Sequence, residues 1–270
     1  MDNSAPILLF DSGIGGLSVY DAVRAILPQA PVIYAADYAG IPYGPKSEAE
    51  IAARVAGLFG RMTERYAPRL ACIACNTAST IALGMVRDVL EIPIVGTVPA
   101  IKPAAALTKT GTIALVGTAA TIRQAYVDDL EARFASDKTL LRIAAPGLVD
   151  CAEEKLRIGA ADLAPLREVA GRLAAMPGGR DVDTIVLACT HFPLLADEFK
   201  TVFGPDVKLV DGAHGIARRI AHLLEGQSFK KACADRFVVT GPVDRAAGLA
   251  PALKARGFAG ATSFTHGPAL

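Results

Sequence analysis

Short apolar runs alternate along the chain with longer segments in which apolar residues recur every three or four positions. The short runs predict strands at 6–10, 32–36, 70–75, 92–96, 112–117, 140–144, 184–189, 207–211 and 236–241. Most of these runs are apolar throughout, as the strands of a parallel sheet are when helices cover both faces. The pattern therefore indicates sheets that lie in the protein interior.

The segments between these runs have the periodicity of amphipathic helices. In residues 14–27, Val19 and Val23 fall on one helical face, and Pro28 ends the pattern. Further helices are predicted at 47–66, 79–90, 121–134, 163–176 and 194–203. This alternation of strand and helix predicts an α/β protein with mostly parallel sheets.

Two pairs of strand ends resemble one another. The strand and turn at 8–16 resemble those at 114–121, and the strand end at Cys75 resembles the one at Cys189. Asp11 and Cys75 lie 64 residues apart, and Thr118 and Cys189 lie 71 residues apart. The likeness is too degenerate to count as a sequence repeat. It nevertheless suggests two similar α/β lobes, each with one polar turn and one cysteine at the strand ends.

Composition narrows the class of protein. Of 270 residues, 52% are hydrophobic and 20% are charged, and the net charge is +1. These values indicate a globular protein and give no electrostatic reason to expect binding to nucleic acid or to a membrane surface. The N-terminal segment lacks a signal-peptide pattern and no apolar stretch is long enough to span a bilayer, so we expect a cytoplasmic protein. The odd count of five cysteines argues against a disulfide framework.

The sequence DSGIGG at 11–16 follows the first predicted strand. It matches neither the dinucleotide fingerprint, which needs a glycine where Ser18 stands, nor the phosphate-binding P-loop, which ends in Gly-Lys-Ser/Thr. Two interpretations remain: a tight turn into a helix, or a turn whose backbone N–H groups face an anion. Asp11 favours a ligand site, because open α/β sheets bind ligands at the carboxyl ends of their strands.

Cys72 and Cys75 have the C-x-x-C spacing of redox and metal sites. In a strand, side chains three residues apart point to opposite faces, so the two thiols cannot line one site if 70–75 is a strand. A thioredoxin-like motif would have to open a helix from a loop, and a zinc site would need further ligands that no second C-x-x-C supplies. We therefore expect Cys72 to be a buried core residue, and we expect no metal site.

Cys75 and Cys189 occupy matched positions at the ends of predicted strands. Asn-Thr follows the first cysteine and Thr-His follows the second. Either cysteine alone would be explained more simply by core packing. Two cysteines in matched positions, each with hydrogen-bonding neighbours, point to a small-molecule site at the strand ends.

Six motifs, in order along the chain, resemble those of glutamate racemases: FDSGIGGLSV, IPYGPKSE, ACNTAST, VGTVPAIKPAA, LACTHFPLL and LVDGAHGIARR. The resemblance covers nearly the whole chain, from Phe10 to the predicted strand near residue 240. The motif ACNT alone also resembles the aspartate and hydantoin racemases. His191 and the motif PYG favour the glutamate racemases over these two groups. One departure is VDGAHG, where the family usually has Asp-Ser-Gly, in a segment that does not contact substrate in the family.

The resemblance implies two similar doubly wound α/β domains, with the active site in the cleft between them. The domains would be 1–97 plus 209–270, and 98–208. The family uses no cofactor, metal or pyridoxal phosphate: one thiolate removes the α-hydrogen of glutamate and an opposed thiol delivers a proton. The implied partner is the small-molecule substrate, L- or D-glutamate, and the implied role is to supply D-glutamate for peptidoglycan. A homodimer is compatible with the sequence.

The resemblance also assigns roles to individual residues. Cys75 and Cys189 are expected to be the two bases, acting on the D- and the L-isomer respectively, with Asp11 beside Cys75 and His191 beside Cys189. Glu153 either matches an acidic position that the family associates with the second thiol or is a plain exposed helix residue. Substrate binding is expected from Asp11, Ser12, Tyr43, Gly44, Asn76, Thr77, Thr118, Thr121, Thr190 and His191.

Three alternatives remain open. They are a racemase of the aspartate or hydantoin type, a thiol-dependent redox or Cys–His hydrolytic enzyme, and an α/β binding protein with inert thiols. Cysteine suits proton transfer because its unperturbed pKa of ~8.5 makes thiol and thiolate both accessible near neutrality. Racemisation requires two such groups on opposite sides of one carbon, which two thiols of one C-x-x-C could not provide.

Overall fold

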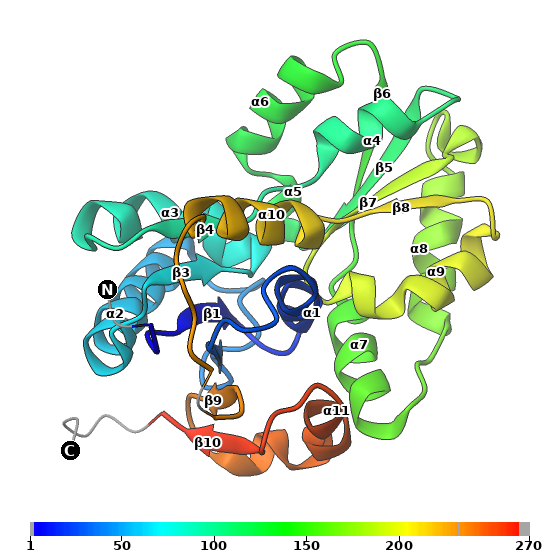
Figure 1. The fold of residues 1–270 in the computed structure, drawn as a ribbon. Helices are drawn as coiled ribbons and strands as arrows, with labels where there is room; N and C mark the ends of the chain where they lie inside the picture. Colours follow the sequence, from blue (N-terminus) through cyan, green and yellow to red (C-terminus); the bar gives the residue numbers. More distant parts are fainter. Residues whose placement is uncertain (1–2, 232, 265–270) are drawn as a thin grey trace. The chain divides into compact units, whose positions relative to one another are not determined.

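The chain divides into two compact units, each built around a parallel sheet. The computed structural model describes residues 3–231 and 233–264 (Figure 1). Unit 1 comprises Met1–Thr97 and Ala213–Leu270, and unit 2 comprises Val98–Gly212. The α/β class with two parallel-sheet domains, predicted from the sequence, is confirmed.

The sheet of unit 1 has six strands in the order β10-β9-β2-β1-β3-β4, and its pairings are parallel. The strands are β1 (Ile7–Asp11), β2 (Val32–Ala36), β3 (Leu70–Ile73), β4 (Ile94–Gly96), β9 (Arg236–Val239) and β10 (Ala261–Ser263). The helices are α1 (Leu17–Ile26), α2 (Glu48–Tyr66), α3 (Asn76–Val89), α10 (Ala213–Leu223) and α11 (Ala250–Ala255), and Val243–Leu249 forms a 3₁₀ segment. The central strands β1, β2 and β3 are buried along their whole length, which is why their sequences are apolar without alternation.

The sheet of unit 2 has four parallel strands in the order β6-β5-β7-β8. They are β5 (Thr112–Gly117), β6 (Thr139–Ala144), β7 (Thr184–Ala188) and β8 (Lys208–Val210). The helices are α4 (Ile101–Leu107), α5 (Ala119–Ile122), α6 (Ala125–Phe134), α7 (Gly147–Ile158), α8 (Ala164–Ala174) and α9 (Ala196–Phe203), with 3₁₀ turns at Gly179–Asp181 and Phe192–Leu195. The predicted domain boundary at 208/209 falls inside β8, which pairs with β7, so residues 209–212 lie in unit 2.

The differences between predicted and observed elements have local causes. The helix predicted at 121–134 is two helices, α5 and α6, because the backbone at Gln124 is extended (φ −67°, ψ 135°). The strand predicted at 70–75 ends at Ile73, and α3 begins at Asn76 instead of residue 79. The edge strand β10 and the helices α4, α7, α10 and α11 were not predicted; β10 is only three residues long and has no apolar run.

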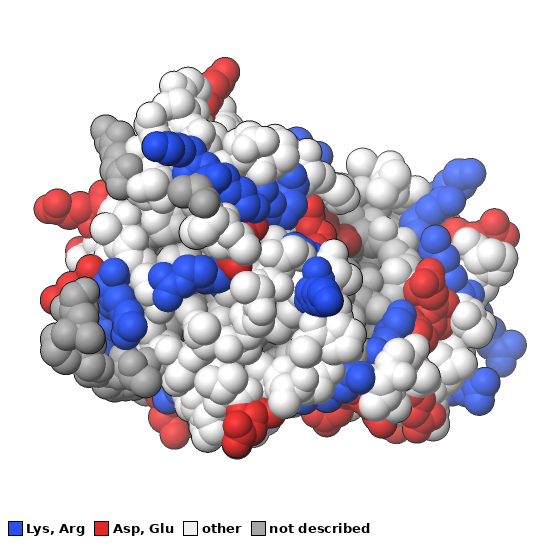
Figure 2. Space-filling model, turned by 60° about the horizontal axis from the view of Figure 1, so that its bottom comes forward, with Lys and Arg blue, Asp and Glu red and all other residues white. Residues whose placement is uncertain are grey.

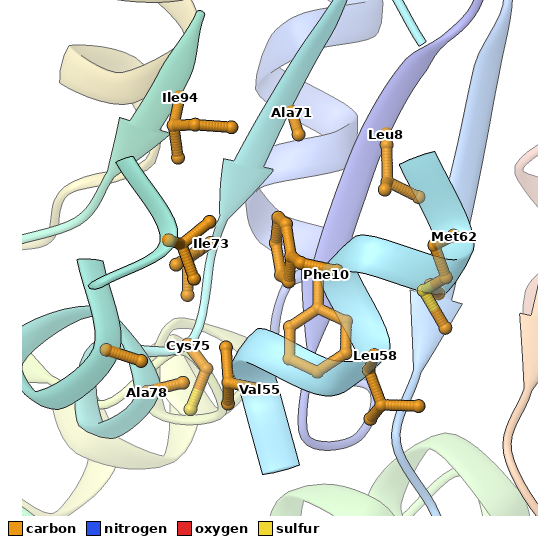
Figure 3. Packing of buried hydrophobic residues seen from close by; sticks show 14 of the residues in the cluster. Leu8, Phe10, Val55, Leu58, Met62, Ala71, Ile73, Cys75, Ala78 and Ile94 are labelled. Carbon is orange, nitrogen blue, oxygen red and sulfur yellow. The ribbon is translucent and has the colours of Figure 1, made fainter. Parts of the chain in front are cut away.

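One face of the first sheet packs against α2 and α3. Figure 3 shows Phe10 and Ile73 of the strands in one cluster with Val55 of α2, and Cys75 beside Val55 and Ala78. Helix α2 starts sharply because Ser47 and Glu50 form a reciprocal capping box at its N-terminus. Cys75 is therefore the last member of an apolar cluster that reaches the carboxyl edge of the sheet.

Cys72 faces away from this cluster. It is aligned with Leu9 of β1 and is 0% exposed, whereas Cys75 packs with Ile73. The extended backbone at Cys75 (φ −63°, ψ 121°) continues the strand alternation past the end of β3. Burial and, to a lesser extent, the charge of Asp11 raise the pKa of the Cys72 thiol. The two thiols of the C-x-x-C thus point to opposite faces, as alternation predicts.

The surface carries both signs of charge. Figure 2 shows basic and acidic side chains scattered among uncharged atoms over the face that it presents. This distribution agrees with the net charge of +1. Within the described ranges, the helices are all too short or too polar to cross a membrane.

Replacing Cys72 by alanine is expected to lower the free energy of unfolding by about 1 kcal/mol, because the change leaves a small void at a fully buried position. Urea denaturation followed by circular dichroism measures this loss. Cys233→Ala is the matched control, because that thiol is exposed and its removal should leave the midpoint unchanged. Equal effects of the two substitutions would contradict the core role of Cys72.

Candidate active site

The turn after β1 is closed around the carboxylate of Asp11. Asp11 is 0% exposed, and its Oδ1 accepts the Gly13 N–H at 2.8 Å. Tyr34 Oη donates to the Gly13 carbonyl, also at 2.8 Å. A Cβ at Gly16 would lie 2.9 Å from the Tyr34 hydroxyl and 3.0 Å from Asp11 Cβ, so this position requires glycine. The glycines of DSGIGG therefore serve at least the tight-turn role that the sequence left open.

Cys75 lies where the third strand gives way to α3. It is the N-cap residue of α3, and no side chain caps that helix. The first backbone N–H groups of a helix favour a negative charge beside them, so this position suits a thiolate. Ser12 reaches the same thiol from the turn after β1, with 3.6 Å between Oγ and Sγ. Cys75 is 5% exposed, which leaves it almost wholly shielded by protein.

The residues after Cys75 form the first turn of α3 and are buried. Asn76 Oδ1 accepts a hydrogen bond from Thr97 Oγ1 at 3.5 Å, and Ser79 Oγ accepts the Thr97 N–H at 2.9 Å. Thr77 is 3% exposed. The chain after β4 is thus attached to the first turn of α3, and the predicted polar residues are held in place.

Tyr43 is held by a buried carboxylate that the sequence analysis missed. Tyr43 Oη donates to Asp37 Oδ2 at 2.6 Å, and Asp37 is 0% exposed. Burial first, then the Asp37 charge and hydrogen bond, and finally the charge on Cys75 raise the pKa of Tyr43, so the phenol lies near that thiol. Asp37 follows β2 directly, as Asp11 ends β1. A polar residue at a strand end was the signal that could have identified it.

Two further side chains donate hydrogen bonds to the Asp37 carboxylate, and one of them, Arg54, carries the opposite charge. Arg54 of α2 donates from Nε to Oδ2 at 2.5 Å and from Nη2 to Oδ1 at 2.6 Å, in the forked geometry that guanidinium and carboxylate groups favour. Thr240, which follows β9, also donates to Oδ1. A Cβ at Gly40 would collide with the Asp37 carboxylate and the Arg54 guanidinium. This network joins the end of β2, helix α2 and the end of β9.

In unit 2, His191 bridges Cys189 and Glu153. His191 Nδ1 lies 3.9 Å from Cys189 Sγ, and His191 Nε2 lies 3.3 Å from Glu153 Oε1. Arg157, one helical turn further along α7, approaches Glu153 Oε2 at 3.3 Å. The Glu153 side chain is 14% exposed and the His191 side chain 3%. The interpretation of Glu153 as a plain exposed helix residue is therefore wrong.

Thr118 and Thr121 are engaged with each other at the start of α5. Thr118 Oγ1 accepts the Thr121 N–H at 3.2 Å, and the two hydroxyl oxygens lie 3.0 Å apart. This is an N-cap, which gives both residues a structural role. Thr190, between Cys189 and His191, is 6% exposed. Contact of these threonines with a ligand stays a prediction.

Each unit gathers its predicted residues at the carboxyl edge of its own sheet. Unit 1 holds Asp11, Ser12, Tyr43, Gly44, Cys75, Asn76 and Thr77, and unit 2 holds Thr118, Thr121, Glu153, Cys189, Thr190 and His191. Across residues 3–231 and 233–264, no group of three or more His, Cys, Asp or Glu side chains is arranged to hold a metal ion. Chemically, each edge offers one thiol with a hydrogen-bonding neighbour, a hydroxyl in unit 1 and an imidazole in unit 2.

Comparison with known proteins gives one consistent family. The model of the Asp/Glu/hydantoin racemase family matches residues 16–220. A glutamate racemase of Sphingopyxis alaskensis is 62% identical over 225 residues, which are 83% of this chain and 84% of the relative. One from Salmonella typhimurium is 46% identical over 222 residues, 82% of this chain and 78% of the relative.

Solved structures agree with the sequence comparison. Escherichia coli glutamate racemase, in complex with L-glutamate and the activator UDP-MurNAc-Ala, superposes with a TM-score of 0.88 at 41% identity, covering 96% of this chain and 98% of that one. Glutamate racemase of Francisella tularensis in complex with D-glutamate gives 0.76 at 26% identity and covers 98% of both chains.

Asp37→Asn is expected to lower the free energy of unfolding by about 2 kcal/mol, because it leaves the Arg54 guanidinium without its counter-charge. The loss is smaller than for a fully buried pair, since the Arg54 side chain is 33% exposed. Chemical denaturation measures it.

Asp21→Asn is the matched control for this substitution. Its carboxylate is 46% exposed and pairs with Arg256 at 3.0 Å, so the expected loss is below ~1 kcal/mol. A loss for Asp37→Asn no greater than this would show that the Asp37 network does not stabilise unit 1.

Proposed function

The chain belongs to the Asp/Glu/hydantoin racemase family and is a glutamate racemase, and we propose that it interconverts L- and D-glutamate by proton transfer between two cysteines. The observation that carries the mechanism is the matched placement of Cys75 and Cys189. Each lies at the carboxyl edge of a parallel sheet, almost fully buried, within hydrogen-bonding reach of a polar side chain, Ser12 at Cys75 and His191 at Cys189. No cofactor enters the proposed reaction.

The proposed reaction needs one thiolate and one thiol. The thiolate takes the α-hydrogen from one side of the substrate carbon, and the thiol opposite supplies a proton to the other side. In the reverse direction the two cysteines exchange roles. Cys75 would act on the D-isomer and Cys189 on the L-isomer, as the resemblance implies. General acid–base catalysis of this kind contributes roughly 10²–10⁴ to a rate when the pKa of the group lies near the working pH.

The neighbours of each thiol suit these roles. At Cys75, the uncapped N-terminus of α3 favours the thiolate, and Ser12 Oγ lies within 3.6 Å of the sulfur. At Cys189, the imidazole of His191 can hold or return a proton, and Glu153 keeps that ring oriented. Asp11, at the end of β1, would assist Cys75.

Substrate binding is proposed to rest on neutral donors. Among the described residues, the backbone N–H groups of Tyr43 and Gly44 have no protein acceptor, so they can donate to a carboxylate. Further donors for the substrate are the side chains of Asn76, Thr77 and Thr190. Hydrogen bonds from fixed donors also stabilise the negative charge that develops when the α-hydrogen leaves.

The proposed mechanism has one geometric requirement that involves both units. Cys75 and Cys189 belong to different units, so both must reach one α-carbon from opposite sides. The cleft between two domains, where the sequence analysis expects the active site, would meet this demand. The wider proposal includes a cytoplasmic location, which rests on the lack of a signal-peptide pattern and of a long apolar stretch in the sequence. It also includes a homodimer, and the supply of D-glutamate for peptidoglycan, which rests on the resemblance.

Purified protein with L-glutamate and no pyridoxal phosphate is expected to lose the circular dichroism signal of the amino acid until it reaches zero. In heavy water, the α-hydrogen should be replaced by deuterium as the signal decays, because each inversion delivers a proton from a solvent-exchanged thiol. Mass spectrometry and proton NMR measure the exchange. Racemisation without any deuterium incorporation would exclude the two-base mechanism, and a flat signal beside an active control enzyme would exclude the activity.

Cys75→Ala and Cys189→Ala are each expected to reduce racemisation by at least roughly 100-fold, since each removes one of two obligatory acid–base groups. Cys72→Ala serves as the control and should keep near-normal turnover, because its thiol is on the opposite face of β3. A Cys–His hydrolase, the second candidate suggested by the Cys189–His191 pair, would need Cys189 and not Cys75. Full racemisation by Cys75→Ala would therefore exclude the two-cysteine mechanism, whereas hydrolysis of an ester or amide that survives Cys75→Ala but not Cys189→Ala would favour the hydrolase.

A further inference from the structure

Tyr34 lies in the middle of β2 with its hydroxyl buried. The residue is 0% exposed, and its ring stacks on Phe237 of β9, with centroids 5.0 Å apart and planes 6° apart. A buried tyrosine hydroxyl needs a hydrogen-bond partner, and this one donates to the Gly13 carbonyl at 2.8 Å. The stacked ring fixes where the hydroxyl lies, so Tyr34 holds a defined point of the turn after β1.

Gly13 links that hydroxyl to the candidate site. Its carbonyl accepts from Tyr34, and its N–H donates to Asp11 Oδ1 at 2.8 Å. Ser12 lies between Asp11 and Gly13 in the chain, and its Oγ is 3.6 Å from Cys75 Sγ. A displacement of Gly13 therefore moves the Asp11 carboxylate and the Ser12 hydroxyl together.

The strand register places Tyr34 beneath this turn. Tyr34 is aligned with Leu9 in the β1–β2 pairing, two residues before Asp11 and on the same face of the sheet. The Tyr34 hydroxyl also occupies the space beside Gly16, where a Cβ would lie only 2.9 Å from it. The turn is thus held between a tyrosine hydroxyl and the start of α1, with little room to shift.

We infer that Tyr34 is a positioning residue of this enzyme, whose hydroxyl keeps the Asp11–Ser12 turn in contact with Cys75. The inference rests on the proposed role of Cys75 as a base. It differs from a packing role, because the ring alone would fill the core and stack on Phe237, whereas only the hydroxyl bonds to the turn.

Tyr34→Phe tests the inference by removing only that hydroxyl. We expect kcat to fall roughly fivefold, as the loss of one positioning hydrogen bond implies, while KM for glutamate changes less than roughly twofold. Tyr20→Phe is the matched control. Tyr20 is also a buried tyrosine of unit 1, and its hydroxyl lies 2.8 Å from Asp235 Oδ2 and 3.0 Å from the Arg256 carbonyl oxygen. Its kcat and KM should stay unchanged.

A second measurement separates this inference from the proposed function. The rate of alkylation by iodoacetamide is followed for Cys75 and Cys189 in the same sample, by mass spectrometry of their peptides. In Tyr34→Phe, the Cys75 rate should rise roughly fivefold relative to Cys189, because the turn that shields the sulfur opens more often. Tyr20→Phe should leave the ratio unchanged. This readout holds its meaning even if glutamate is not the substrate.

Gly16→Ala is the second variant, because its new methyl group would press on the same hydroxyl and on Asp11. It should change kcat and the alkylation ratio in the same direction as Tyr34→Phe. An unchanged Cys75 to Cys189 ratio in both variants would overturn the inference and leave Tyr34 as a core residue. Equal changes in Tyr34→Phe and Tyr20→Phe would also overturn it, since they would reflect a general loss of stability.

Discussion

Parallel strands end at one edge of their sheet, and the candidate chemistry of this protein depends on that constraint. In unit 1 the ends of β1, β2, β3 and β9 bring four segments to a common edge, although they are far apart in sequence. Side chains at or just after the last residues of these strands come together at this edge: Thr240 donates to Asp37, and Ser12 Oγ lies 3.6 Å from Cys75 Sγ. Asp11, Asp37, Cys75 and Thr240 all lie at such positions. The fold thus concentrates polar side chains while its strands stay apolar.

The strand alternation that separates Cys72 from Cys75 was accessible from the sequence, because it depends only on the geometry of an extended chain. The fold class was accessible for a similar reason: nine apolar runs separated by helical periodicity leave few other arrangements. The break between α5 and α6 and the early start of α3 were not accessible, because both depend on the backbone at single residues, Gln124 and Cys75. Local sequence patterns therefore identify helices and strands more reliably than they identify the residues at which these begin and end.

The Asp37 network was not accessible from the sequence for a different reason. Asp37 and Thr240 are 203 residues apart, and no local pattern pairs a strand-end aspartate with a threonine at that separation. Arg54 belongs to an amphipathic helix in which an arginine ordinarily faces solvent. Asp37, Arg54 and Thr240 come together only through the strand order, which places β9 beside β2. By contrast, the Cys189–His191–Glu153 chain involves residues that the resemblance had already paired, and the structure adds their distances.

The discontinuity of unit 1 has a consequence for how the protein is made. Val98–Gly212 emerges from the ribosome before β9 exists, so unit 2 can complete its sheet while unit 1 still lacks part of its own. During that interval Asp37 lacks Thr240, the Tyr34 ring lacks Phe237, and the Tyr20 hydroxyl lacks Asp235. The residues that complete the first half of unit 1 are thus synthesised after the whole of unit 2. A nascent chain that ends before residue 235 would contain all of unit 2, but its unit 1 would still lack Asp235, Phe237 and Thr240.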